Sequence, residues 1–179
     1  MTDYQLIIDK YYPAGTPLRD IYMRHCRSVA DEALAIARRK NLPLSEAMIE
    51  GAAMTHDIGI FLTSAPTIEC RGTEPYIRHG LLGAGLLRRE GAPEEWARVA
   101  ERHTGAGLTA AEIASQHLPL PHEDLVPETL LERLICYADK FYSKSGSMKR
   151  KPLEKVRAQM ASFGEDSLRR FDGLHEEFT

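Results

Sequence analysis

The residues best suited to chemistry are four histidines spread along the first part of the chain. His25, His56, His79 and His103 each fall on, or at the end of, a segment of helical period, near its apolar side. A neutral imidazole can bind a metal through one ring nitrogen while an acceptor fixes the other, and a carboxylate can bridge two cations. One such histidine is readily explained as a hydrogen-bonded helix residue, but four of them, converging with two aspartates, could hold two divalent metals.

The segments that must position these histidines have a helical pattern. Apolar residues recur every three or four positions between Arg19 and Lys40, and similar patterns begin at Ser45, at His79 and at Leu130. The segment 61–75 contains prolines and several Thr and Ser residues, so it is the longest irregular stretch and a candidate rim or lid. The pattern predicts an all-α bundle of about six to nine helices with a metal site in its interior.

Length and composition predict one cytoplasmic domain without a nucleic-acid partner. The chain has 179 residues, of which 43% are hydrophobic and 27% charged, as in ordinary globular proteins. Its 23 basic and 26 acidic side chains leave a net charge of −3, too little to attract nucleic acid or a membrane surface. The N-terminus shows no leader pattern, and no apolar run is long enough to span a bilayer. We expect a single domain over residues 1–179, with a core at about 21–143 and a C-terminal helical extension at 152–179.

One set of these residues resembles a known family. His25, the sequence His56-Asp57-Ile58-Gly59 and the late Asp139 follow the order of the HD superfamily of metal-dependent phosphohydrolases, whose signature is His, then His-Asp, then Asp. The resemblance runs from about residue 21 to residue 143. His79-Gly80 and His103-Thr104-Gly105 are similar to the additional histidines of the dinuclear branch, and the pattern is most similar to the enzymes that split diadenosine tetraphosphate symmetrically.

The resemblance implies a ligand set for two metals. By that resemblance the first metal is held by His25, His56, Asp57 and Asp139, the second is held by His79 and His103, and Asp57 bridges the two. Iron is the expected metal, manganese the next, and cobalt, nickel and zinc also suit ligands without sulfur.

The resemblance also implies a reaction. It is the hydrolysis of a phosphoester or phosphoanhydride in a small phosphorylated metabolite, such as a nucleotide or dinucleotide polyphosphate, by a metal-bound hydroxide, with His56 and Asp57 at the catalytic centre. The candidate contacts to substrate phosphate are Arg27, Arg102, Lys140 and Lys144. The basic run 149–151 is interpreted as a solvated loop rather than a phosphate clamp.

Two other functions stay open at this point. A mixed-valent di-iron oxygenase can be built on the same fold with a similar constellation, and the sequence does not distinguish it from a hydrolase. A non-catalytic nucleotide-binding module is less favoured, because such proteins commonly lose metal ligands and all six are present here. A homodimer is compatible with each of these functions.

Overall fold

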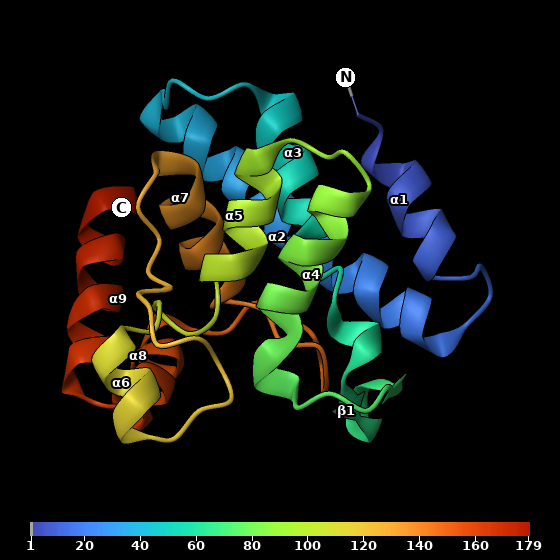
Figure 1. The fold of residues 1–179 in the computed structure, drawn as a ribbon. Helices are drawn as coiled ribbons and strands as arrows, with labels where there is room; N and C mark the ends of the chain where they lie inside the picture. Colours follow the sequence, from blue (N-terminus) through green and yellow to red (C-terminus); the bar gives the residue numbers. More distant parts are fainter. Residues whose placement is uncertain (1) are drawn as a thin grey trace.

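The computed structural model describes residues 2–179 and confirms the predicted all-α fold (Figure 1). Nine α-helices occur in the described residues, together with short 3-10 turns and one pair of two-residue strands. The elements are α1 (Tyr4–Tyr11), α2 (Pro17–Lys40), α3 (Glu46–Thr55), β1 (Ser64–Ala65), β2 (Cys70–Arg71), α4 (His79–Arg89), α5 (Glu94–Arg102), α6 (Ala110–Ser115), α7 (Leu130–Asp139), α8 (Leu153–Ser162) and α9 (Glu165–Phe178).

Local sequence signals account for the helix ends near the site. Thr16 caps α2 by accepting a hydrogen bond from the Arg19 amide, and the proline that follows it occupies the first turn. The helix ends at Asn41, which adopts the left-handed conformation with φ of 50°. Ser45 then caps α3 in the same way as Thr16 caps α2. These signals set the directions in which α2 and α3 enter the core.

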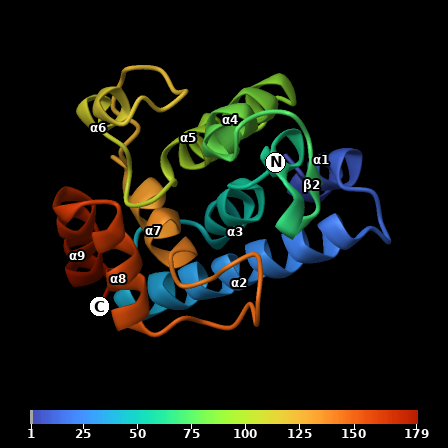
Figure 2. The ribbon, with the colours of Figure 1, turned by 90° about the horizontal axis from the view of Figure 1, so that it is seen from below.

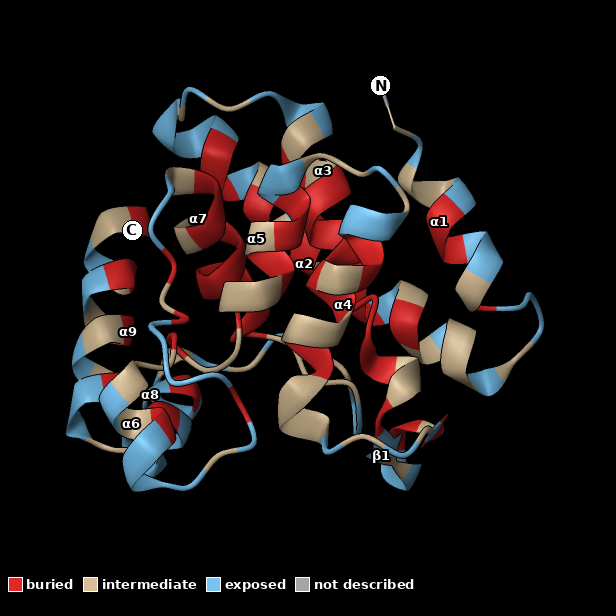
Figure 3. Cartoon of the chain, viewed as in Figure 1, coloured by how far each residue is buried: buried red, intermediate tan, exposed pale blue. Residues whose placement is uncertain are grey.

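Five of the described helices pack together at the centre of the bundle. α3 packs on α2, α4 packs on α5, and α7 lies against both α2 and α5. Figure 3 shows that buried residues concentrate on α2, α3, α5 and α7, whereas α1 and α6 lie at the periphery with exposed outer faces. The turned view in Figure 2 shows α2 running beneath α3 and α7 as the longest helix. The metal-ligating candidates therefore lie on, or directly after, these central helices.

The last helix, α9, packs on α7 through aromatic side chains, and α8 packs on α9. Tyr137 lies 5.7 Å from Phe171 and 5.5 Å from Phe178, measured between ring centroids, and its hydroxyl is 2.9 Å from His175 Nδ1. Both phenylalanines are fully buried. α8 and α9 thus extend the core on the side of α7 where the loop 143–152 leaves the bundle.

The segment 61–75 is more ordered than its composition suggests. β1 and β2 pair antiparallel, with Ala65 opposite Cys70, and the Gly72 amide donates to the Thr63 carbonyl oxygen at 2.8 Å.

Sequence analysis did not identify α6, which is capped by the reciprocal pair Thr109 and Glu112. Across residues 2–179, the helices all lack the combination of length and apolar character that crossing a membrane demands.

Close backbone contact brings α4 against the turn that follows His56. A Cβ atom at Gly59 would overlap the carbonyl oxygen of His79 and would lie 2.5 Å from the Gly83 nitrogen. Only a residue without a side chain permits this approach, which places the start of α4 beside the His-Asp pair. Gly59, two positions after the His56-Asp57 pair, is thus required for the close packing at the site.

We expect Gly59→Ala to lower the free energy of unfolding by about 1–3 kcal/mol, because the added methyl group forces two backbone segments apart. The matched control is Gly173→Ala on α9, where nothing lies within 4 Å of the added atom; this change should stabilise by roughly 0.5–1 kcal/mol. Urea unfolding of the metal-chelated proteins measures both. Equal stability of the two variants would contradict the close-contact explanation.

Candidate metal centre

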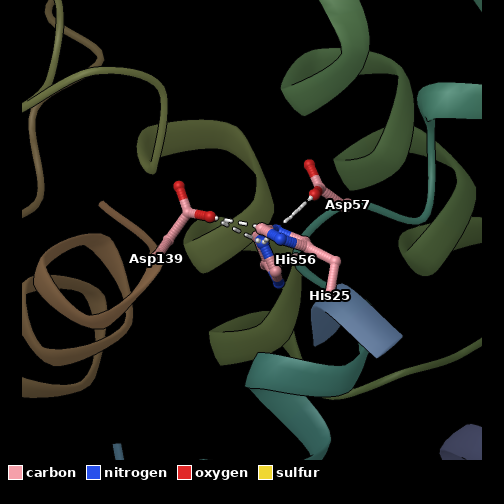
Figure 4. A group of neighbouring side chains, drawn as sticks. All are labelled: His25, His56, Asp57 and Asp139. Carbon is pink, nitrogen blue, oxygen red and sulfur yellow. Dashed lines mark hydrogen bonds and ion pairs between the residues drawn. The ribbon is translucent and has the colours of Figure 1, made fainter. Parts of the chain in front are cut away.

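The six predicted ligands come together in two adjoining groups. His25, His56, Asp57 and Asp139 form one group, and the second group consists of Asp57 with His79 and His103. Within each group the potential ligand atoms lie within 4.8 Å of one another, and every member is buried. Figure 4 shows the side chains of the first group pointing toward one another.

The Asp57 carboxylate joins the two groups. Its Oδ2 atom is 3.1 Å from His25 Nε2 and 3.3 Å from His56 Nε2, and its Oδ1 atom is 3.4 Å from His79 Nε2 and 3.3 Å from His103 Nε2. Each oxygen therefore faces a different group. This is the placement that a carboxylate bridging two cations requires.

The ligands come from five helical segments. His25 lies in the middle of α2, whereas Asp139 is the last residue of α7. His56 and His103 follow the last residues of α3 and α5 as C-caps, and His79 is the first residue of α4. Three helices thus end at the site, and the partial negative charge of a helix C-terminus favours cations there.

Backbone carbonyls orient three of the four imidazoles. The Nδ1 atoms of His56, His79 and His103 lie 2.6, 2.7 and 2.8 Å from carbonyl oxygens three residues earlier in the chain. A proton on Nδ1 satisfies each carbonyl and leaves the Nε2 lone pair directed into the site. For His25 the structure gives Nδ1 no such partner within the described residues.

The electrostatics of the second group favour neutral imidazoles. Burial, and next the nearby His103, lower the pKa of His79 to about 3, and burial also lowers the pKa of His103. At Asp57 burial alone would raise the pKa, but the Lys144 ammonium and then His56 hold it well below its usual value. A neutral imidazole and an ionised carboxylate are the forms that bind metals.

The site residues fit divalent metals. Both Asp57 oxygens are fully buried, and Oδ2 is 2.7 Å from the Lys144 ammonium. His25 Nε2 lies 3.3 Å from His56 Nε2, and His79 Nε2 lies 3.1 Å from His103 Nε2. Imidazole lone pairs that converge on a buried carboxylate are stabilised by a cation placed among them. The nitrogen and oxygen donors suit iron, manganese, cobalt, nickel or zinc. The buried His and Asp cluster is therefore compatible with a metal site.

A pocket of about 380 Å³ opens in front of the ligands. His79, His103 and Asp139 form part of its wall, and the remainder comes from the hairpin, the loop after α7 and the end of α8. Its cationic lining residues are Lys140, Lys144 and Lys151. The β1 hairpin and α8, which contribute lining residues, both lie toward the lower end of the bundle in Figure 1.

The lysines of the pocket differ in their contacts. Lys140 Nζ is held by Asp139 Oδ2 at 2.6 Å and by the His103 carbonyl oxygen at 2.8 Å, so it braces two ligand residues. Lys144 Nζ forms an ion pair with Asp57 Oδ2 at 2.7 Å and lies 5.9 Å from the centre of the Tyr76 ring. It is thus the cation placed closest to the bridging carboxylate.

The two arginines predicted as substrate contacts do not line this pocket. Arg27 pairs with Glu50 at 2.6 Å, and Arg102 Nη1 bonds to the Val126 carbonyl oxygen and pairs with Glu128. Both side chains are directed to partners remote in sequence, which spacing along the chain does not reveal.

Two other residues line the pocket. Tyr76, which sequence reasoning did not single out, stacks on His79 with ring centroids 4.6 Å apart. Lys151 also lines the pocket, so the basic run 149–151 is not only a solvated loop. The only sequence signals for them were the proximity of Tyr76 to His79 and the basic run itself.

The chain belongs to the HD domain family. The model of that family, described as HD domain, matches residues 22–143, which contain all six ligands. This confirms the broad resemblance seen in the sequence, whereas the diadenosine tetraphosphate branch is a finer placement that the family match does not reach. No solved structure matched the chain significantly.

Curated relatives carry a specific name. The chain is 31% identical over 175 residues to a tRNA (cytidine(56)-2′-O)-methyltransferase of Thermoplasma volcanium, a match that covers 97% of this chain and 46% of the relative. An enzyme of the same name from Picrophilus torridus is 31% identical over 161 residues, covering 89% of this chain and 42% of the relative. An uncharacterized protein of Methanocaldococcus jannaschii is 33% identical over 120 residues, covering 65% and 63%. The chain thus spans less than half the length of the two named relatives.

These names correct the predicted function. The relatives are called tRNA methyltransferases, so the prediction of a phosphohydrolase that cleaves a small nucleotide is wrong, and so is the prediction of no nucleic-acid partner. Two physical reasons explain the errors. A set of His and Asp ligands indicates a metal but does not specify the reaction, and a net charge summed over the chain does not describe the field at one pocket.

We expect His79→Ala to leave about one metal per chain and Asp57→Ala to leave none, because Asp57 faces both groups and His79 only the second. The control is His122→Ala, which changes an exposed histidine outside both groups and should leave two metals. Elemental analysis after anaerobic loading with iron or manganese measures the content. Identical metal content in the His79 and Asp57 variants would contradict a bridged pair of sites.

Proposed function

We propose that this chain is a two-metal HD domain that works in the 2′-O-methylation of a tRNA cytidine and holds the tRNA at the metal centre. The support for the process comes from the names of the relatives, which match nearly the whole chain at 31% identity. The support for tRNA binding at the metal centre comes from the residues that line the pocket there. We expect iron as the bound metal, with manganese next, because the donor set is imidazole and carboxylate without sulfur.

The observation that carries the proposal is the cationic pocket directly on the ligands. Lys140, Lys144 and Lys151 line a space that reaches His79, His103 and Asp139. Two divalent cations bound there would attract anionic oxygens and neutralise their charge. Lys144 would then hold a remaining oxygen of a phosphate and the other two lysines would add positive charge, so the pocket suits the RNA backbone despite the net charge of −3.

The size of the pocket favours a nucleotide turned out of a loop. About 380 Å³ accommodates a part of one strand, not a helix. Proteins that recognise RNA by sequence mostly bind loops and bulges, whose unstacked nucleotides can enter such pockets. The proposal therefore assigns to this chain the holding of a tRNA loop nucleotide.

Within the pocket the residues have different roles. Lys144 is the direct phosphate contact, because its ammonium lies at the bridging carboxylate and reaches the open side of the site. Lys140 is a positioning residue, since its ammonium is already engaged by Asp139 and by the His103 carbonyl oxygen. Lys151 contributes charge at the rim, where its Nζ atom is 3.1 Å from Gln159 Oε1.

We expect the metal-loaded chain to bind a tRNA transcript. Lys144→Ala should weaken that binding by roughly tenfold, and the slope of log affinity against log salt concentration should become shallower by about 1. Fluorescence anisotropy measures the affinity at several salt concentrations. Lys40→Ala, on the exposed end of α2 about 22 Å along the helix from His25, is the matched control and should change little. Elemental analysis of each variant verifies equal metal content.

The same affinity measurement is repeated on protein from which the metals have been removed by chelation. Chelated protein should lose most of its affinity for tRNA, because the buried cations contribute much of the attraction. Binding that persists undiminished after chelation and in Lys144→Ala would place the RNA elsewhere on the protein. Absence of tRNA binding by the metal-loaded chain would overturn the proposed function.

A further inference from the structure

A second pocket adjoins the metal-centre pocket on the side of α6 and α9. Its volume is about 260 Å³, and it shares Thr104, Gly105 and Phe163 with the first pocket. None of the six ligand residues lines it. The two pockets are therefore neighbouring compartments that share three wall residues.

Phe163 stands at the boundary between the compartments. Its side chain is 54% exposed, an unusual state for a large apolar residue, and only one other such side chain, Leu6, is found among the described residues. The backbone beneath it is fixed, because its amide donates to the Met160 carbonyl oxygen at 3.1 Å and closes α8. An exposed aromatic ring on a fixed backbone beside a cationic pocket is suited to stacking on a base.

The walls of the second pocket are apolar and electrically balanced. Ile77, Leu108 and Leu118 contribute its apolar surface. Arg170 lies in the wall, but both oxygens of Glu112 accept from its Nη2 at 2.9 Å, and its Nε donates to the Ala106 carbonyl oxygen at 3.1 Å. Because its charge is paired with Glu112, Arg170 stiffens the pocket and does not make it cationic.

The contrast between the compartments points to one kind of occupant. The first is cationic and suits a phosphate, whereas the second is neutral, largely apolar and bordered by an exposed aromatic ring. The exposed amide of Gln116 at its edge can donate to and accept from the polar edge of a planar ring. A nucleotide combines these features, with a phosphate and a base joined by a ribose.

We infer that the second pocket is a nucleobase subsite, in which Phe163 stacks on the base of the RNA nucleotide whose phosphate lies at the metals. The inference rests on the proposed function, since it takes the phosphate in the first pocket as its starting point. It goes beyond that proposal by assigning the base a place remote from the metal ligands. It also gives a role to a part of the molecule contributed by α6, α8 and α9.

Two phosphate esters isolate the contribution of the base. Cytidine 5′-monophosphate serves as a probe for one RNA nucleotide, and ribose 5-phosphate presents the same sugar phosphate without a base. Calorimetric titration of the metal-loaded chain should show the nucleotide binding more tightly than ribose 5-phosphate by between about fivefold and a hundredfold, the usual effect of stacking a base on an aromatic side chain.

Variants then separate the two compartments. Phe163→Ala should bring the ratio of the two affinities close to one while leaving the affinity for ribose 5-phosphate unchanged, and Phe163→Trp should preserve the ratio. Lys144→Ala should weaken both esters and preserve the ratio. Leu6→Ala, at the other exposed large apolar residue, is the control and should change neither affinity.

The outcomes distinguish this inference from the proposal beneath it. Equal affinities of the unaltered protein for the two esters, or a ratio that survives Phe163→Ala, would overturn the nucleobase subsite and leave phosphate binding at the metals intact. Failure of both esters to bind would contradict the phosphate site itself. Because the Phe163 side chain is largely exposed, its replacement should leave the melting temperature nearly unchanged, and this measurement verifies that a lost ratio is not lost folding.

Discussion

The structure depends on a buried carboxylate that lies among four imidazole nitrogens. Asp57 is fully buried, and its two oxygens face four imidazole nitrogens at 3.1–3.4 Å. An ionised carboxylate in such a place is costly unless cations compensate it. The surroundings supply this compensation through Lys144 and through two groups of donors that fit divalent metals. The arrangement of the helices follows from the need to bring these donors to one anion.

One local device is used three times to meet that need. At His56, His79 and His103 the imidazole bonds to the carbonyl oxygen three residues earlier, so each ring is oriented by its own helical turn. Such a turn is encoded locally, but the meeting of three turns is not. This meeting requires α4 to approach the turn after the His56-Asp57 pair, and the absence of a side chain at Gly59 permits that approach. Local orientation and close packing together produce the bridged geometry.

Charge in this protein has to be considered locally. The chain as a whole is slightly acidic, yet lysines at the end of α7 and in the loop that follows it gather at one pocket beside the candidate metal ligands. The adjoining pocket carries a paired arginine and glutamate and so stays neutral. A molecule with this surface can receive a polyanion at one point while repelling it weakly elsewhere, since charges separated by more than about 10 Å are largely screened in salt.

The sequence by itself determined the helical class, the positions of α2, α3, α4 and α7, and, through its resemblance to the HD superfamily, the six residues that gather at the centre, because periodicity, capping and the His-Asp motif are local properties of the chain. It did not reveal the partners of Arg27 and Arg102, which pair with Glu50 and Glu128 across the fold. Nor did it indicate α6, the pocket role of Tyr76 or the exposed position of Phe163. Those features arise where segments distant in sequence meet, and the environment of a side chain there is set by packing, so only the tertiary structure decided them.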